Sequence, residues 1–157
     1  MMTLMLTLHI LATIVWIGGM FFAHMVLRPA SIAMLEPNQR LQLWSAVFKH
    51  FFYWVWIAII VLITTGVLLL VNMGGFKTTP IHIHVMAGIA GFMVFLYCVL
   101  YFIFYMRFRK LVENNNYPAA ASTLNSMRLL VVSNLTLGIF TVVIATAGGV
   151  LLPMLSA

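Results

Sequence analysis

Charged residues are scarce in this sequence, and acidic residues are nearly absent. Only 6% of the 157 residues are charged, and Asp and Glu together contribute two of them. Soluble globular domains carry about 25% charged residues, so a chain of this composition cannot cover a water-exposed surface. The scarcity of carboxylates excludes a paired-carboxylate site, and the sequence contains neither a Ser-His-Asp set nor a phosphate-binding glycine loop. Hydrolytic chemistry is therefore not expected.

Cysteine is also scarce, since Cys98 is the only one. A single cysteine excludes a disulfide framework and a Cys-x-x-Cys metal site. The net charge of +6 does not indicate nucleic-acid binding, because the basic residues stand between apolar runs and form no basic-aromatic surface. The length indicates one domain over residues 1–157.

Long apolar runs dominate what is present. Each has the length of about 20 residues that a helix needs to cross the hydrocarbon core, and none contains Asp, Glu, Lys or Arg. Only helices and closed barrels satisfy the backbone in that environment, and the runs lack strand alternation. We therefore predict an all-α integral membrane protein, a four-helix bundle surrounded by the lipid bilayer. The runs are Leu4–Leu27, Phe51–Val71, Val85–Met106 and Leu129–Leu152, within helices expected at about 3–28, 47–72, 80–107 and 120–153.

The connecting segments contain start signals for helices. Thr79 and Pro80 fit the N-cap and the first residue of the third helix. The spacing of apolar residues within Pro29–Lys49 predicts a separate, short amphipathic helix in the headgroup layer. Pro118 marks an early start for the fourth helix.

The uneven distribution of basic residues predicts the orientation of the helices. Seven lie on the side reached after the first helix, and Lys77 alone lies on the other side. Because basic loops stay in the cytoplasm, we expect both termini outside the cytoplasm, in the periplasm of a Gram-negative source, and a multi-pass protein of the cell inner membrane. Tryptophans and tyrosines are expected at the membrane boundaries or against lipid. The seven basic residues are Arg28, Arg40, Lys49, Arg107, Arg109, Lys110 and Arg128.

All five histidines lie near the ends of the apolar runs. In the expected topology, His9, His82 and His84 are on the outer side, whereas His24 and His50 are on the inner side. His9 and His24 are about 22 Å apart along one helix and share a broad face, which suits two haem irons, one near each leaflet. The second ligand would be His82 or His84 outside and His50 inside. The alternative is that these histidines are interfacial side chains without a ligand role.

The third helix has two faces that compete for the interior. One face carries small residues, which leave room for a flat ring or for close helix contact, so helical phase favours His84 as the inward histidine. The faces are His84, Gly88, Gly91, Phe95 and Cys98 on one side, and His82, Met86, Ile89 and Met93 on the other.

The fourth helix and the methionines give two further indications. Asn134 starts a small face on the fourth helix and is expected to contact protein rather than lipid. Methionines lie near histidines on the first and third helices, and thioether with imidazole suits Cu(I). The small face is Asn134, Gly138, Thr141, Ala145 and Gly148, and the methionines are Met5, Met20, Met25, Met86 and Met93.

Several short motifs resemble those of the CopD-like (copper resistance D) membrane family. The first helix contains His9-Ile-Leu-Ala-Thr-Ile-Val-Trp16-Ile-Gly-Gly19, followed by Leu27-Arg28-Pro29. The later matches are Thr65-Gly66, Arg107-Phe-Arg109 and Arg128-(x5)-Asn134-Leu-Thr-Leu-Gly138. The His-(x6)-Trp pattern is also similar to that of the HemJ-type protoporphyrinogen oxidases, a related four-helix group.

The resemblance to these oxidases implies haem b, with an essential histidine in the first helix and an essential His-x-Lys in the third. His9 matches the first, and Pro80-Ile-His82-Ile-His84 lies where His-x-Lys is expected, with His84 in place of the lysine. The alignment of this motif therefore favours His82 as the ligand, whereas helical phase favours His84.

The leading hypothesis is a haem b-binding membrane protein for electron transfer or redox chemistry, with one or two haems. His9 with His82 or His84 would hold the outer haem, and His24 with His50 the inner one. Trp16, Asn134 and Arg28 would lie near a cofactor, and Arg28, Lys49 or Lys77 would pair with propionates. A membrane or periplasmic redox protein would be the partner. The alternatives are copper-ion transport, protoporphyrinogen IX oxidation, and a structural subunit, with a homo-oligomer left open.

Overall fold

The computed structural model describes the backbone of residues 1–155 and the side chains of residues 1–148. Over this range the chain is helical, with short connections and no strand. The first helix comprises α1 (Met2–Thr13), the π-helical turn η1 (Ile14–Gly18), α2 (Gly19–Phe22), the π-helical turn η2 (Ala23–Leu27) and α3 (Arg28–Met34). The second helix is α4 (Pro37–Asn72), the third comprises α5 (Ile81–Val99), η3 (Leu100–Tyr105) and α6 (Met106–Glu113), and the fourth is α7 (Tyr117–Leu155).

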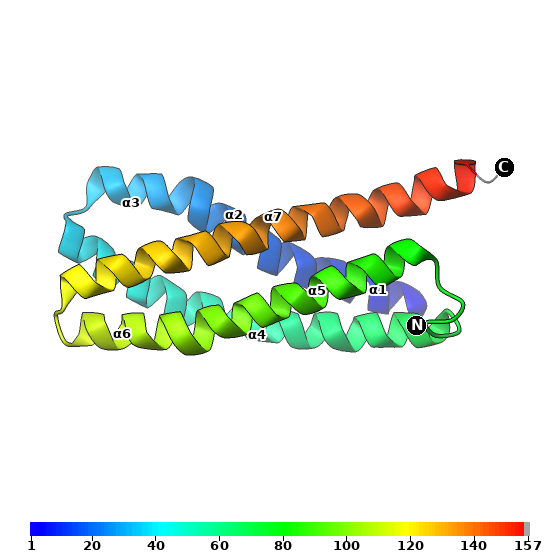
Figure 1. The fold of residues 1–157 in the computed structure, drawn as a ribbon, viewed down its shortest axis with the longest axis horizontal. Helices are drawn as coiled ribbons and strands as arrows, with labels where there is room; N and C mark the ends of the chain where they lie inside the picture. Colours follow the sequence, from blue (N-terminus) through cyan, green and yellow to red (C-terminus); the bar gives the residue numbers. More distant parts are fainter. Residues whose placement is uncertain (156–157) are drawn as a thin grey trace.

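Four helices among the described residues are long and apolar enough to cross a membrane. They span Met2–Met34, Pro37–Asn72, Ile81–Glu113 and Tyr117–Gly148. This confirms the all-α class and the four-span prediction, and it makes the protein a multi-pass membrane protein. Figure 1 shows the four helices side by side along the long axis of the molecule.

The second helix begins earlier than the sequence indicated. The prediction of a separate amphipathic helix over Pro29–Lys49 is wrong, because α3 continues the first helix to Met34 and α4 starts at Pro37. A capping box explains this start, since the side chains of Glu36 and Gln39 bond reciprocally to backbone N–H groups. The apolar residues that suggested an interfacial helix instead continue the buried face of α4; they include Leu41, Trp44 and Phe48.

The start of the third helix is also shifted, by one residue. Pro80 is the N-cap of α5, and the helix begins at Ile81. The hydroxyl of Thr79 donates to the carbonyl of Phe76 rather than capping the helix, at 3.3 Å. The preceding loop turns through Gly74 and Gly75, whose positive φ angles of 91° and 84° are accessible to glycine at no steric cost.

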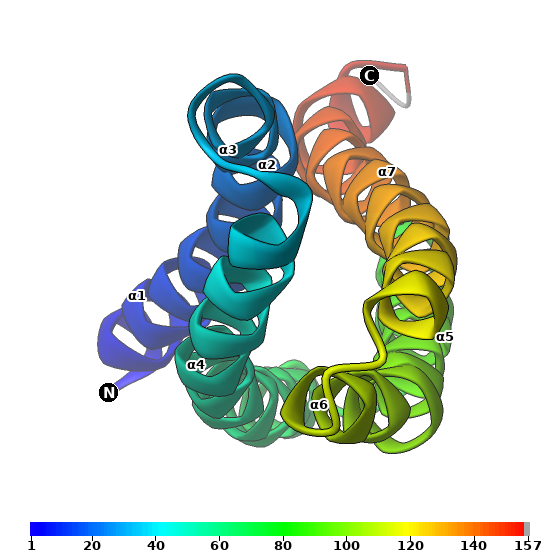
Figure 2. The same ribbon diagram turned by 90° about the vertical axis from the view of Figure 1, so that its left-hand side faces the viewer.

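The bundle consists of two pairs of helices. Helix α1 packs mainly on α4, and α5 packs mainly on α7. In Figure 2 the first helix lies beside α4, and the third lies beside α7, so that the four helices form a ring in chain order. We call the end where α1 begins the terminal end, and the end that contains α3, α6 and the start of α7 the basic end.

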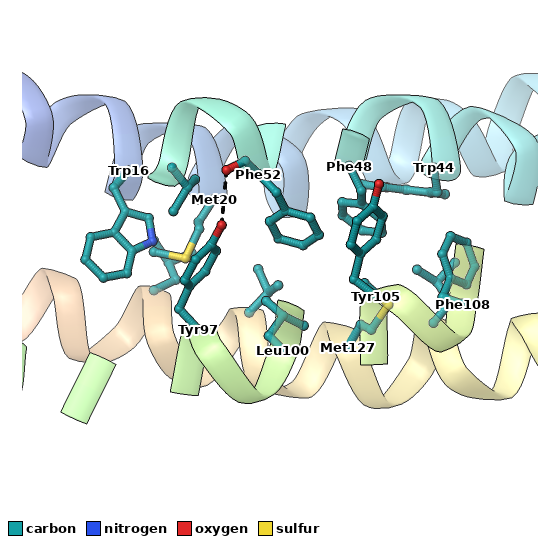
Figure 3. Close-up of a cluster of buried hydrophobic side chains, with 14 of the residues drawn as sticks. Trp16, Met20, Trp44, Phe48, Phe52, Tyr97, Leu100, Tyr105, Phe108 and Met127 are labelled. Atoms are coloured by element: carbon teal, nitrogen blue, oxygen red, sulfur yellow. Dashed lines mark hydrogen bonds between the residues drawn. The ribbon is translucent and has the colours of Figure 1, made fainter. Parts of the chain in front are cut away.

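Aromatic side chains fill the centre of the bundle. Phe52 on α4 stacks on Phe48 and meets Tyr105 edge-on, with ring centroids 5.4 Å and 4.7 Å apart. The hydroxyl of Tyr97 donates to the carbonyl of Phe52 at 3.1 Å (Figure 3). The expectation that tryptophans and tyrosines lie at boundaries or against lipid is therefore wrong for Trp16 and Tyr97, which are buried midway along their helices, whereas Tyr53 and Trp54 are exposed.

The inward faces of α5 and α7 are defined by packing. The glycine stripe of α5 does not face the interior, since a Cβ at Gly88 or Gly91 would meet no atom within 4 Å. The opposite face of α5 is the inward one, with Met93 buried. On α7 the small face does point inward, because a Cβ at Gly138 would lie 2.9 Å from Ile17. The predicted inward phase of the His84 face is thus wrong, and that of the Asn134 face is confirmed, with Asn134 only 1% exposed.

Candidate functional site

His9 lies in the seam between α1 and α4. Its Nδ1 is 2.8 Å from the hydroxyl oxygen of Thr65. Gly66, the next residue on α4, leaves room for the ring, because a Cβ there would be 3.4 Å from the Cε1 of His9. The first-helix histidine and the Thr65-Gly66 pair, which are far apart in the sequence, therefore meet in one place. The same seam contains Met5, whose Sδ is 4.0 Å from the side-chain amide of Asn72.

The hydrogen bonds of Thr65 determine the tautomer of His9. The Thr65 hydroxyl has one proton, and it donates this proton to the carbonyl of Val61 at 2.6 Å. It must then accept from Nδ1 of His9, so the neutral ring carries its proton on Nδ1. The Nε2 atom makes no hydrogen bond among the described residues, and its lone pair is available. This is the arrangement that orients a histidine ligand toward a metal.

His82 faces the fourth helix. A Cβ on Gly148 of α7 would lie 2.6 Å from the Cγ of His82, so the imidazole packs closely on the glycine. Within the part of the chain that the structure describes, Nδ1 of His82 is buried without a hydrogen-bond partner. A buried imidazole nitrogen without a partner is costly, which makes this atom a candidate for an external ligand.

His84 holds the loop between α4 and α5. Its Nε2 lies 2.9 Å from the carbonyl oxygen of Phe76, and its Nδ1 lies 3.2 Å from that of Pro80. The imidazole also packs on the ring of Phe76, with centroids 5.5 Å apart. Both ring nitrogens thus contact carbonyl oxygens, which assigns His84 a structural role in this loop.

His9 and His82 lie at similar depths in the bundle. Gly138 of α7 meets both Ile17 and Met93, which puts these two residues at one level. His9 precedes Ile17 by eight residues and His82 precedes Met93 by eleven, so they lie about 12 Å and about 16 Å from that level toward the terminal end. The difference of about 4 Å leaves the two histidines on facing helix pairs near the same height.

The two inner histidines have different surroundings. His24 lines a small cavity near the basic end with Trp44, Arg28 and Arg128. His50 is exposed on α4 and does not line this cavity. Lys49 and Lys77 are exposed as well. The buried Asn134 has no hydrogen-bond partner for its Oδ1 among the described residues.

Two features of the sites escaped the sequence analysis. Thr65 stood out only through the family resemblance, although it is the residue that fixes the His9 ring. Arg128 entered the sequence analysis as an orientation signal and as part of a family motif, but not as a residue that lines a cavity; it is half-buried and lines two cavities. Arg128 directly precedes an apolar run, and this position could have indicated a residue at the membrane boundary.

The comparisons with known proteins add no family. A scan against protein-family models finds no match, and searches of curated proteins and of solved structures find no match either. Among the described residues, no group of three or more His, Cys, Asp or Glu side chains could hold a metal ion.

Proposed function

We propose that this protein binds haem b in the membrane and uses it for electron transfer, with His9 as an axial ligand. The observation that carries the proposal is the Thr65–His9 hydrogen bond of 2.8 Å, which leaves Nε2 with a free lone pair. A histidine on a membrane-spanning helix that serves only packing does not require a fixed tautomer. A histidine that ligates a metal does, and its partner hydrogen bond fixes both ring orientation and tautomer.

His82 is the second axial ligand in this proposal, in preference to His84. The carbonyl oxygens of Phe76 and Pro80 lie 2.9 Å and 3.2 Å from the ring nitrogens of His84, and a neutral imidazole donates its single proton to one of them, which holds the ring in the loop before α5. His82 instead has a buried nitrogen without a partner among the described residues, and its depth is close to that of His9. The two imidazoles come from different helix pairs, α1 with α4 and α5 with α7.

The residues present fit a haem in their donor chemistry. Two neutral imidazoles and an apolar surround are typical of a haem b site. Bound there, the haem would supply reversible one-electron chemistry, while the chain orients the ligands and keeps water from the iron. Lys77, exposed in the loop of the terminal end, is the basic residue positioned to attract propionates. We propose one haem at this site, because His24 lines a small cavity that His50 does not reach.

Copper transport is the second candidate function. It is favoured by Met5, which lies in the α1–α4 seam one helical turn from His9. A thioether beside an imidazole is a soft donor pair that suits Cu(I). The family resemblance also implies protoporphyrinogen IX oxidation, and this reaction would use a haem at the same site.

Purification and spectroscopy test the proposal. The wild-type protein should show a Soret band and a sharp reduced α-band, and a pyridine haemochrome assay should give about one haem per chain. His9→Ala and His82→Ala should each remove the haem or convert it to a high-spin form, because each removes an axial ligand. A colourless wild type that contains copper would replace this proposal with the transport function.

The controls use histidines with other roles. His50→Ala should leave the spectrum unchanged, because His50 is exposed and far from the site. His84→Ala should also retain a low-spin spectrum, since the ring nitrogens of His84 lie against carbonyl oxygens of the loop. If His84→Ala loses the haem and His82→Ala keeps it, the ligand assignment on α5 is reversed. If His9→Ala keeps a normal low-spin spectrum, ligation through the first helix is wrong.

A further inference from the structure

A cavity at the basic end lies between the beginnings of α4 and α7. Its volume is about 570 Å³, and Arg40 and Arg128 are the charged residues in its wall. A smaller cavity of about 20 Å³ adjoins it and shares Leu124 and Arg128. The remaining polar residues of the larger cavity are Asn38, Tyr117 and Asn125. We call the two together the basic cavity.

The walls of the basic cavity provide hydrogen-bond donors that lack partners. Among the described residues, the Nε atoms of Arg28 and Arg128 and the indole Nε1 of Trp44 are buried without a hydrogen bond. Trp44 is only 4% exposed, and it lines the smaller cavity with both arginines. Each of these groups is a donor without acceptor capacity. The complementary ligand is therefore an anion with several acceptor oxygens.

The charge in this region is not neutralised by the chain. Arg28 and Arg40 lie close enough to Arg128 for their charges to repel it. The sequence contains two acidic residues, and neither serves here: Glu113 pairs with Arg109 at 2.7 Å, and Glu36 caps α4. Removing like charges from water without a counter-charge is unfavourable, so an external anion would relieve the repulsion.

The helix termini add to the positive potential. The first residues of α4, Pro37 and Asn38, and those of α7, Tyr117 and Pro118, all line the larger cavity. A helix N-terminus carries the equivalent of about half a positive charge. The Glu36 carboxylate offsets this charge at α4, whereas the first turn of α7 contains no acidic residue. The two termini are joined by a hydrogen bond of 3.2 Å from the amide of Gln42 to the Tyr117 hydroxyl.

The depth of the basic cavity indicates the source of the anion. Arg28 directly follows one apolar run and Arg128 directly precedes another, so both guanidinium groups lie where hydrocarbon gives way to headgroups. Apolar residues, including Leu41, Ala121 and Leu124, form the rest of the wall. Basic pockets between membrane helices are suited to lipid headgroups at this level.

We propose that the basic cavity binds the phosphate of an anionic membrane phospholipid. Arg128 and Arg40 are the direct donors in the larger cavity. Arg28 and the Trp44 indole contribute through the smaller cavity, whose volume suffices for a water molecule between them and the phosphate. The lipid would be held as a constituent of the basic end, where it replaces the counter-charge that the sequence lacks.

Native mass spectrometry of the full-length protein in neutral detergent tests this proposal, with phosphatidylglycerol and phosphatidylcholine as probes. The wild type should retain one phosphatidylglycerol per chain and exchange phosphatidylcholine freely. Arg128→Gln should weaken phosphatidylglycerol binding by about tenfold or more, since a charge-assisted hydrogen bond contributes that much. Arg107→Gln is the matched control, because Arg107 is an exposed arginine of the same end outside the cavity, and it should bind as the wild type does. Equal binding by the two variants would overturn the proposal.

Two further arms separate the sources of the anion. Inorganic phosphate should raise the thermal stability no more than sodium chloride does at the same ionic strength. If phosphate stabilises the protein more than sodium chloride and phosphatidylglycerol does not stabilise it, the site takes a free anion. The haem content of Arg128→Gln should equal that of the wild type; a loss would assign the cavity to cofactor propionates instead. Arg40→Gln, judged for folding by circular dichroism, provides the same comparison if Arg128→Gln does not fold.

Discussion

At the scale of residues, one hydroxyl proton decides the chemistry available to His9. Thr65 donates to its own helix at Val61 and can only accept from the imidazole. The histidine ring is therefore set by a residue that would not itself touch a cofactor. The sequence could indicate His9, because a histidine near the end of an apolar run is conspicuous. It could not indicate the partner, because a threonine inside such a run most often bonds only to its own helix.

Replacing Thr65 by valine tests the role of this hydroxyl. Thr65→Val keeps the shape of the side chain but removes the acceptor, so the His9 ring loses its fixed tautomer and orientation. We expect haem affinity to fall by about 10- to 100-fold, as for other residues that support a metal ligand, with a changed α-band. The measurement is a haem titration of the apo-protein.

Thr64→Val is the matched control for this substitution. Thr64 is the adjacent residue, and it is exposed, so the same chemical change there should leave haem affinity within error of the wild type. Equal losses in both variants would mean that the effect comes from the helix rather than from the hydrogen bond to His9.

At the scale of elements, the sequence predicted the existence of the four helices better than it predicted which face of each helix is buried. In a membrane the lipid is as apolar as the protein interior, so hydrophobic periodicity does not separate the buried face of α5 from its lipid face. The glycine stripe suggested a packing surface, yet Phe95 in that stripe is 60% exposed. Specific contacts between helices set the buried face instead; one example is the contact of Met93 on α5 with Gly138 on α7. The π-helical turns, such as η1 with the buried Trp16, likewise carry no signal in residue type.

Gly138 is a restrictive small residue of α7, at the level of Ile17 and Met93. Its absent side chain lets α7 approach Ile17 and Met93, and a Cβ would lie 2.9 Å and 3.2 Å from them. Gly138→Val should therefore destabilise the bundle by about 1–3 kcal/mol through overpacking. The measurement is unfolding of the purified protein in detergent.

Gly91→Ala provides the comparison on the open face of α5. A Cβ at Gly91 meets nothing within 4 Å, and alanine favours the helix by about 1 kcal/mol over glycine. This variant should be as stable as the wild type or more stable. A destabilised Gly91→Ala would show that the exposed stripe packs on another molecule in the membrane.

At the scale of the whole molecule, the two ends differ in charge. Seven basic residues flank the apolar runs toward one end, and Lys77 alone is at the other. Helix α4 has 36 residues and is about 54 Å long, whereas the hydrocarbon core is about 30 Å thick. The helices therefore extend beyond the hydrocarbon, and the basic cavity lies in this extension. The sequence predicted the charge difference between the two ends. It did not predict that α4 extends beyond the hydrocarbon, because the first residues of α4 were assigned to a separate amphipathic helix.

We expect the basic end to face the cytoplasm, because basic flanks are retained there. In a Cys98→Ser background, Lys77→Cys should react with an impermeant thiol reagent in intact cells, and Asn114→Cys should react only after the membrane is opened. Both positions are exposed, so burial does not account for a difference. The reverse pattern would put His9 and His82 on the cytoplasmic side and the basic cavity outside.

The pairing of helices described above also has a consequence for biogenesis. Each pair is formed by helices that follow each other along the chain, α1 with α4 and α5 with α7. Each can enter the bilayer as a hairpin while the ribosome is still adding residues, without waiting for the other. The proposed ligands His9 and His82 belong to different hairpins, so the haem site is complete only after the second hairpin has docked. Cofactor loading would then be the last step of assembly, and a chain that stalls after its first hairpin would present His9 alone.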